Sequence, residues 1–208
     1  MKVTRYNQSC LLIEDNGARI LIDPSGQEKE RLGEFGQLDA VLYTHEHSDH
    51  FEAEMAAGFA KQGITVYANA STAKKIDGDK TEVSDGQELD IKGLKIKVIQ
   101  LPHCLMPNGS EGPQNVGYLI NEKLFHPGDG KELADFSVDY LALPITGPDV
   151  SMKDSFMFAK QVSAKDVIPI HYDKIGANPD VYATFAGFFP DEFKYKFHVL
   201  AEGQSLDI

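Results

Sequence analysis

Three histidines and an aspartate that follow one strand-like run constrain the fold of this chain more than any other feature. Residues 38–44 are mostly apolar and rich in β-formers, as expected for a buried strand. The next six residues read His-Glu-His-Ser-Asp-His and contain His45, His47, Asp49 and His50. Successive side chains of an extended strand alternate between its faces, so the chain must turn just before His50 to bring all four together. The sequence therefore predicts a strand that turns sharply into a helix.

The residue types in this run are those that bind divalent metal ions. Imidazole and carboxylate groups are the preferred ligands of borderline metals such as zinc. The other interpretation is a solvated histidine-rich loop in which Asp49 caps the next helix, because Asp49 and Glu52 have the spacing of a capping box. Capping accounts for Asp49 but for none of the three histidines, so the run favours a metal site.

Short strands and helices alternate along the rest of the chain. Apolar residues at helical spacing predict helices over 51–61, 72–76 and 152–162. Strand patterns occupy 9–13, 18–22, 64–68, 89–91, 94–100, 116–120, 123–125, 140–143 and 167–170. This order suits an α/β fold with two facing sheets and helices outside, a four-layer αββα sandwich, although periodicity alone does not separate it from a doubly wound sheet.

Size, charge and composition exclude several classes of protein. The 208 residues suffice for one substantial core, so we expect a single domain over 1–208. The 20 basic and 32 acidic residues give a net charge of -12, which repels polyanions and makes nucleic acid an unexpected partner. The first ten residues lack the apolar core of a secretory signal. No apolar run approaches the ~18 residues of a membrane span. The two cysteines are too few for a disulfide framework, as is usual in a reducing compartment. We expect a cytoplasmic protein that does not enter the membrane.

The histidine-rich run resembles the signature of the metallo-β-lactamase superfamily, which is His-x-His-x-Asp-His after a strand. His45, His47, Asp49 and His50 match it position by position, and the likeness extends over nearly the whole chain. The resemblance implies the metallo-β-lactamase-like form of the αββα sandwich. It also implies further metal ligands in later loops.

Three later residues stand where that family places its remaining ligands. His103 ends a strand, Asp129 follows a glycine after another strand, and His171 ends a third strand. Each also has a plainer interpretation, as a loop histidine, a turn residue and a core histidine respectively, and the ligand role is favoured for all three. Family members often carry Thr or Ser after the bridging aspartate, so Gly130 departs from the pattern.

The resemblance implies a centre of two divalent metal ions. The first is held by His45, His47 and His103, the second by Asp49, His50 and His171, and Asp129 bridges the two. Two divalent cations and two carboxylates give a formal charge of +4 - 2 = +2, which a bridging hydroxide lowers to +1. Zinc is the expected metal, with manganese, nickel and iron as alternatives.

Such a centre predicts a metal-dependent hydrolase with Asp49 and Asp129 as catalytic residues. Metal-bound water has a pKa of roughly 7, so a metal-bridging hydroxide would attack a small ester, lactone or phosphodiester, anionic substrates included. The candidates for a proton donor to the leaving group are Asp49, Tyr172 and His126. Specificity would depend on the loops at 105–114 and 173–179, whose shapes the sequence does not specify.

A compact branch of the superfamily offers the nearest likeness. The run Ile22-Asp23-Pro24, the Pro-Ile-His-Tyr run that contains His171, and the absence of lid or nuclease insertions resemble that branch. It includes the ascorbate-6-phosphate lactonases and the N-acylphosphatidylethanolamine phospholipase D-like enzymes.

Other functions are compatible with the same fold. An iron-dependent redox enzyme would reuse related ligands, but the full ligand set without a glutamate in place of a histidine, and without a flavin domain, favours hydrolysis. A non-catalytic metal-binding protein is the next alternative, although structural zinc sites are usually closed. A secreted β-lactamase is disfavoured by the missing export signal.

Three residues outside the predicted ligand set are expected to have other roles. His126 and His198 are expected to be structural or surface residues, and Cys104 a buried thiol. The oligomeric state is not predicted.

Overall fold

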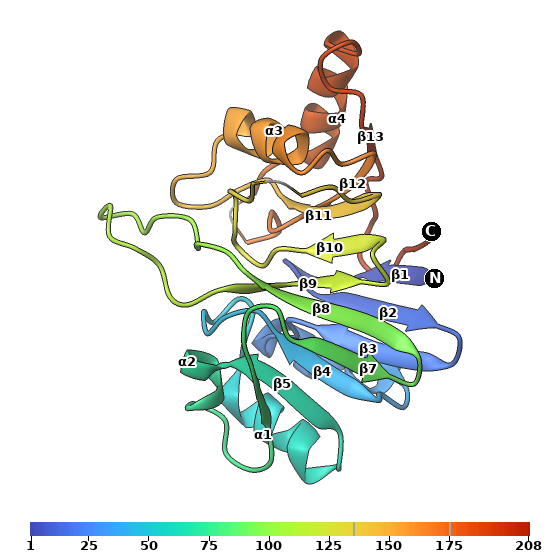
Figure 1. Ribbon diagram of the computed structural model, residues 1–208, viewed down its shortest axis with the longest axis vertical. Coiled ribbons are helices and arrows are strands. Elements are labelled where there is room, and N and C mark those ends of the chain that lie inside the picture. Colours follow the sequence, from blue (N-terminus) through green and yellow to red (C-terminus); the bar gives the residue numbers. More distant parts are fainter. Residues whose placement is uncertain (135, 175) are drawn as a thin grey trace.

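Two mixed sheets face one another in the computed structural model, which describes residues 1–134, 136–174 and 176–208 (Figure 1). Seven strands of the described ranges form the first sheet, in the order β14 (Ser205–Asp207), β1 (Lys2–Arg5), β2 (Leu11–Asp15), β3 (Ala18–Ile22), β4 (Ala40–Tyr43), β5 (Thr65–Asn69) and β6 (Thr81–Val83). Seven others form the second sheet, in the order β13 (Lys196–Phe197), β12 (Asp166–Ile170), β11 (Tyr140–Pro144), β10 (Leu124–His126), β9 (Val116–Ile120), β8 (Leu94–Gln100) and β7 (Glu88–Ile91).

Helices cover the outer faces of both sheets. The helical elements are η1 (Gly26–Phe35), α1 (Ala53–Lys61), α2 (Ala70–Ala73), α3 (Met152–Gln161) and α4 (Pro179–Phe188). In Figure 1, α1 and α2 lie at one end of the molecule and α3 and α4 at the opposite end, with both sheets between them. The predicted four-layer αββα sandwich is therefore confirmed. Within the described ranges, none of the helices has the length and apolarity needed to cross a membrane.

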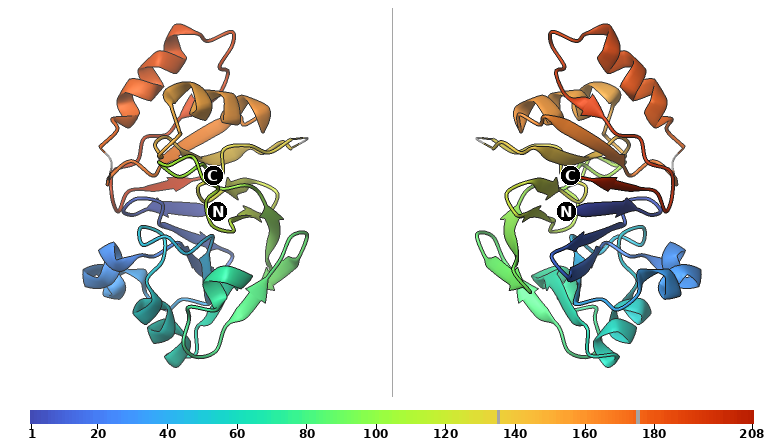
Figure 2. Two further views of the ribbon diagram at one scale, coloured as in Figure 1. Left: turned by 90° about the vertical axis from the view of Figure 1, so that its left-hand side faces the viewer. Right: turned by 90° about the vertical axis from the view of Figure 1, so that its right-hand side faces the viewer.

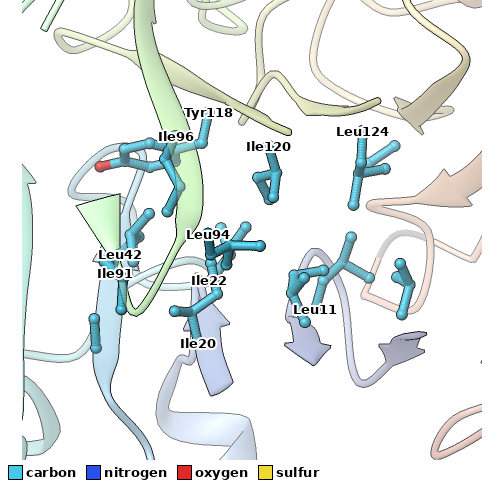
Figure 3. Close-up of a cluster of buried hydrophobic side chains, with 14 of the residues drawn as sticks. Leu11, Ile20, Ile22, Leu42, Ile91, Leu94, Ile96, Tyr118, Ile120 and Leu124 are labelled. Carbon is cyan, nitrogen blue, oxygen red and sulfur yellow. The ribbon is translucent and has the colours of Figure 1, made fainter. Parts of the chain in front are cut away.

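The strands of the first sheet are apolar on both faces because both faces are covered. Leu11 and Ile20 point into the space between the sheets, where they pack with residues of the second sheet such as Ile96 (Figure 3). Their chain neighbours Leu12 and Leu21 point the other way, into the cluster beneath the outer helices. Alternation along each strand thus builds two apolar layers at once.

The second sheet is built on the same principle. Tyr118 and Leu124 face the shared core between the sheets (Figure 3). Leu141 and Phe125 face outward and pack with Phe156 of α3 in a third cluster. The helices of this layer are held to the sheet by aromatic side chains, which bury large apolar areas.

Most predicted elements are present, with shifted ends. The strands predicted over 94–100 and 116–120 occur as β8 and β9 with those bounds, whereas the predicted helix 72–76 is found as α2 (Ala70–Ala73). That helix begins earlier because the side chain of Asn69 accepts a hydrogen bond from Thr72 N and caps it.

The peripheral elements were not predicted. These are η1, α4, β1, β6, β13 and β14. In η1, Ser25 and Glu28 form a capping box, a signal that was present in the sequence. Strands β1 and β14 pair with each other through residues at opposite ends of the chain, and Figure 2 shows the two termini side by side.

The topology brings several loops to one edge of the sandwich. Strands β3, β4 and β5 are parallel, as are β10, β11 and β12. The carboxyl ends of neighbouring parallel strands lie at the same edge of a sheet, which is where open α/β sheets bind their ligands. The histidine-rich run follows β4, Asp129 follows β10 and His171 follows β12.

Packing against β10 leaves no room for a side chain at Gly117 in β9. A Cβ atom there would lie 2.6 Å from the ring of Phe125 and 2.9 Å from the carbonyl oxygen of His126. We expect Gly117→Ala to lower the free energy of unfolding by about 1–3 kcal/mol, because such overpacking forces neighbours out of place.

The matched control is Gly58→Ala in α1, where nothing lies within 4 Å of the added atom. There the loss of glycine from a helix should raise the free energy of unfolding by roughly 0.5–1 kcal/mol. Denaturant unfolding of both variants measures the two changes in the free energy of unfolding. Equal stability of the two would contradict the packing described for β9 and β10.

Candidate metal centre

The predicted turn after β4 is present, and it gathers the histidine-rich run. His50 N donates to the carbonyl oxygen of His47 over 2.9 Å, so the chain bends at this point. Helix α1 starts three residues later with Glu52 as its N-cap, whose side chain accepts from Met55 N. Glu52 rather than Asp49 therefore caps the helix, which leaves the Asp49 carboxylate available to the centre.

The other three predicted ligands come from the second sheet. His103 lies just beyond β8 and forms an isolated β-bridge with Gly130. Asp129 lies in the turn after β10. His171 follows β12 directly with a positive φ of 62°, a conformation that non-glycine residues seldom adopt, and its N–H donates to the carbonyl oxygen of Gln8. Both sheets thus supply groups to one place.

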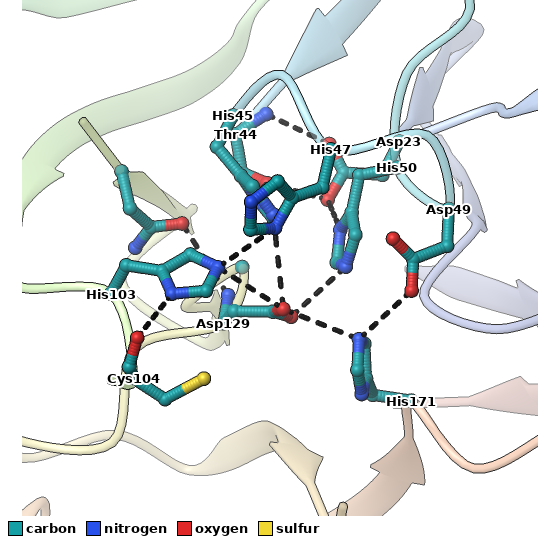
Figure 4. Close-up of polar contacts among 12 residues, drawn as sticks. Asp23, Thr44, His45, His47, Asp49, His50, His103, Cys104, Asp129 and His171 are labelled. Carbon is teal, nitrogen blue, oxygen red and sulfur yellow. Dashed lines mark hydrogen bonds and ion pairs between the residues drawn. The ribbon is translucent and has the colours of Figure 1, made fainter. Parts of the chain in front are cut away.

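All seven predicted ligands converge, in two groups. One group is His45, His47, His103 and Asp129, and the other is Asp49, His50 and His171. In each group the nearest nitrogen and oxygen atoms of the side chains all lie within 4.8 Å of one another. Figure 4 shows the imidazoles arranged around the Asp129 carboxylate, with Asp49 beside His171.

Asp129 is the centre of this arrangement. One of its oxygens, Oδ1, lies 2.9 Å from His50 Nε2. The other, Oδ2, lies 3.2 Å from His171 Nε2, 3.4 Å from His103 Nε2 and 3.7 Å from His45 Nε2. The residue is only 5% exposed. A single buried carboxylate therefore contacts members of both groups.

Contacts outside the centre orient two of the imidazoles. Thr44 Oγ1 donates to Asp23 Oδ2 over 2.7 Å, so it must accept the hydrogen of His45 Nδ1, 3.0 Å away. The same Asp23 oxygen lies 2.8 Å from His50 Nδ1 and accepts its hydrogen. Both rings are thereby held with Nδ1 protonated and Nε2 directed inward.

Backbone carbonyls do the same for the rings of the second sheet. His103 Nδ1 donates to the carbonyl oxygen of Cys104, and His171 Nδ1 donates to that of Thr146 over 2.8 Å. Cys104 thus contributes its backbone rather than its thiol to this contact.

The donor atoms that face inward fit divalent metal ions. Among the described residues, the Nε2 atoms of His45, His50 and His171 and Oδ1 of Asp129 are buried without a hydrogen-bond partner, although His50 Nε2 and Asp129 Oδ1 lie close together. Buried polar atoms without partners are rare in folded proteins. Imidazole and carboxylate donors around one point satisfy a cation such as zinc, and the outer hydrogen bonds give the rings of His45, His50, His103 and His171 the tautomer that coordination requires.

The titration of the metal-free centre reflects the same geometry. Burial lowers the pKa of His50 and of His103, but the Asp129 carboxylate outweighs burial and raises the pKa to about 9 for His50 and about 10 for His103. His171, also opposed by burial, has a raised pKa for the same reason. The pKa of Asp129 is held well below its usual range by His50 and His171, despite its burial. Without metal, protons balance the buried carboxylate.

Glycines flank Asp129 because its turn is tightly enclosed. A Cβ at Gly128, whose φ is 59°, would lie 2.3 Å from Asn115 Oδ1. A Cβ at Gly130 would lie 2.3 Å from Leu101 Cδ1, so a Thr or Ser there would require the Leu101 side chain to move. Instead Asp129 N donates weakly to Asn115 Oδ1 over 3.4 Å, and Asn115 Nδ2 donates to the carbonyl oxygen of Pro127 over 2.9 Å. The departure at Gly130 thus has a steric cause.

Two of the three candidate proton donors are engaged elsewhere. His126 Nε2 donates to the carbonyl oxygen of Ser9, and its Nδ1 accepts from Gly128 N. The hydroxyl of Tyr172 donates to the carbonyl oxygen of Leu200. Asp49 is the candidate that faces the centre.

The remaining predicted features lie as follows. His198 pairs with Asp166 Oδ1 at 2.6 Å, outside both ligand groups. The 105–114 loop packs on the centre, since a Cβ at Gly112 would lie 2.3 Å from His103 Nδ1. Position 175 of the 173–179 loop lies outside the described residues.

Sequence reasoning missed the residues that orient the ligands. Asp23 was noticed only as part of a motif, and Asn69, Gln8 and Asn115 were not noticed. Asn69 Nδ2 donates to the carbonyl oxygens of Thr44 and of residue 114, both over 2.8 Å. Nothing in their local sequence distinguishes these residues from ordinary loop residues, because each acts on a segment far away in the chain.

Two facing sheets between helical layers, with an imidazole and carboxylate cluster at the ends of their strands, define a protein of the metallo-β-lactamase fold. Residues 2–171 match a family model described as a beta-lactamase superfamily domain, and the chain belongs to that superfamily.

Relatives of similar length are similar to this chain over most of its residues. A UPF0173 protein from Pyrococcus abyssi is 31% identical over 208 residues, which cover 93% of this chain and 89% of the relative. A protein named UPF0173 metal-dependent hydrolase from Bacillus cereus is 30% identical over 198 residues, which cover 83% and 86%. The structure of Igni18, a metallo hydrolase from Ignicoccus hospitalis, superposes with a TM-score of 0.79 at 20% identity over 99% of this chain and 97% of that one. The last likeness concerns the fold.

Metal binding should release protons near neutral pH. At pH 7.5, below the raised pKa values of about 9 and 10, His50 and His103 carry protons that a metal ion must displace. The apparent metal affinity should therefore rise with pH from 6.5 towards 9, while the number of protons released falls. Calorimetric titration in buffers of different ionisation enthalpy measures that number. Metal binding without proton release at pH 7.5 would contradict the charge balance described here.

Proposed function

We propose that this protein is a dinuclear metal-dependent hydrolase that cleaves a small ester, lactone or phosphodiester. The observation that carries this proposal is the pair of ligand groups on either side of one buried carboxylate, Asp129. Both groups contain neutral imidazole donors and at least one carboxylate, a combination suited to zinc. The Bacillus cereus relative named as a metal-dependent hydrolase supports the same class of reaction.

Each side of the proposed centre would hold one ion. His45, His47 and His103 would bind the first, and Asp49, His50 and His171 the second, with Asp129 between them. Bound divalent cations supply acidification of water to a pKa of roughly 7 and Lewis-acid stabilisation of developing negative charge.

Asp49 is the residue that would transfer the proton during the reaction. Asp49 is ionised at neutral pH, because its hydrogen bond with His171 and the charge of His50 outweigh burial and lower its pKa. Its side chain is 16% exposed, against 6% for Asp129, so it lies on the more open side of the centre. Oδ2 is engaged by Gln8, which leaves Oδ1 to take the proton from the attacking water. As the water oxygen bonds to the carbonyl carbon or phosphorus and the leaving oxygen departs, Oδ1 would return that proton to it.

The expected substrate is a small molecule, anionic substrates included. The formal excess of positive charge in a two-metal centre favours an anion locally, whereas the net charge of -12 disfavours nucleic acid. We infer that the 105–114 loop would contact the substrate and contribute to specificity, and its packing of Gly112 against His103 supports this.

Removing one ligand should abolish metal binding and hydrolysis together. We expect His47→Ala and Asp129→Ala to contain fewer than two metals per chain and to lose at least about 100-fold in activity, since even outer partners of metal ligands cost 10–100-fold. His198→Ala, which removes a surface imidazole paired with Asp166, is the matched control and should retain both properties. Elemental analysis and a panel of ester, lactone and phosphodiester substrates measure the two effects.

The outcome separates the competing functions. A ligand variant that still holds two metals per chain would contradict the assignment of that residue. Absence of turnover by the two-metal protein on the whole panel would contradict hydrolysis. Visible absorbance of the protein purified without added metal would indicate iron and a redox function, since zinc centres are colourless.

A further inference from the structure

The turn between β1 and β2 reaches the centre through a residue that no ligand signature includes. Gln8 is fully buried, with an exposed fraction of 0%, and has a positive φ of 55°. Glutamine is seldom buried and seldom adopts this backbone conformation. A buried side-chain amide must find partners for both its oxygen and its nitrogen.

The amide of Gln8 has one partner at each end. Its Oε1 accepts from Lys174 N over 3.1 Å, and its Nε2 donates to Asp49 Oδ2 over 3.1 Å. The orientation of the amide is unambiguous, because a backbone N–H can only donate and an ionised carboxylate can only accept. Gln8 therefore fixes one oxygen of a proposed metal ligand.

The backbone of Gln8 fixes the other side of the same group. Its carbonyl oxygen accepts from His171 N over 2.8 Å. Its N–H donates over 2.7 Å to Asp173 Oδ2, which also forms an ion pair with the buried Arg5. Four contacts thus tie the turn that carries His171 to the β1–β2 region, three of them through Gln8 and the fourth between Arg5 and Asp173.

We propose that Gln8 is a positioning residue, which orients Asp49 and His171 and so determines the affinity of the second metal position. This inference rests on the proposed two-metal function. A neutral amide is suited to the task, since it directs the carboxylate by a hydrogen bond without adding a positive charge that would compete with the cation. The first position, formed by His45, His47 and His103, receives no hydrogen bond from Gln8.

The test compares two amides with the same kind of contacts. Gln8→Met keeps the length of the side chain and removes both hydrogen bonds. The control is Asn121→Leu, because Asn121 also has a positive φ, accepts from Lys95 N over 2.9 Å and donates to Asp15 Oδ2 over 2.9 Å, outside both ligand groups. Zinc titration of the metal-free proteins against a chelator of known affinity resolves the two binding steps, and thermal unfolding reports stability.

We expect Gln8→Met to weaken one of the two zinc affinities by about 10–100-fold and to leave the other within about twofold. Asn121→Leu should lower the unfolding temperature and leave both affinities unchanged. In an Asp49→Asn background, Gln8→Met should cause little further loss, because the group it orients has been altered. If Gln8→Met does not fold, Gln8→Asn keeps the amide but is one methylene shorter, and it should weaken the same single step.

Two results would overturn the inference. One is wild-type affinity at both steps in the Gln8 variant. The other is an equal loss at both steps that matches the loss in Asn121→Leu, which would indicate a general structural role. If the wild-type protein itself binds fewer than two zinc ions, the proposed two-metal function fails first. The two failures are therefore distinguishable.

Discussion

The buried carboxylate of Asp129 is the group on which the rest of the centre depends. An ionised carboxylate away from water is strongly destabilising unless positive charge and hydrogen bonds compensate it. Here four imidazole nitrogens lie within 3.7 Å of its oxygens. In the metal-free protein three of these imidazoles, those of His50, His103 and His171, supply the charge as protons, which is why their pKa values are raised. Metal ions can replace those protons, so one electrostatic requirement links folding to cofactor binding.

The sandwich meets this requirement by holding ligands from two sheets at one edge. Its strands are apolar on both faces, so the centre lies between rigid layers rather than on a flexible surface. Hydrogen bonds that the rings donate to Asp23, Thr44 and Thr146 then orient them. Positive φ values at Asp23 and His171 show where the backbone is strained to do so. Strain of this kind persists where the surrounding packing enforces it.

Much of the central architecture was predictable because it depends on local patterns. Strand β8 was identified with correct bounds by its alternation, because one of its faces is exposed, and β9 by its continuous apolar run, because it is buried throughout. Strands β1 and β14 were missed, because they are short, contain few apolar residues, and pair with each other from opposite ends of the chain. Helix α4 was also missed. Its exposed Phe185 and Phe188 weaken the apolar and polar contrast that marks an amphipathic helix.

The identity and order of the candidate ligands were determined by the sequence alone. A cluster of imidazoles beside a carboxylate after a strand has few structural explanations, and the later histidines and Asp129 occupy matching positions. Only the tertiary structure decided which ring nitrogen faces the centre, why a side chain at Gly130 would collide with Leu101, and that Gln8 supports Asp49. These features depend on contacts between segments far apart in the chain, and no local pattern records such contacts.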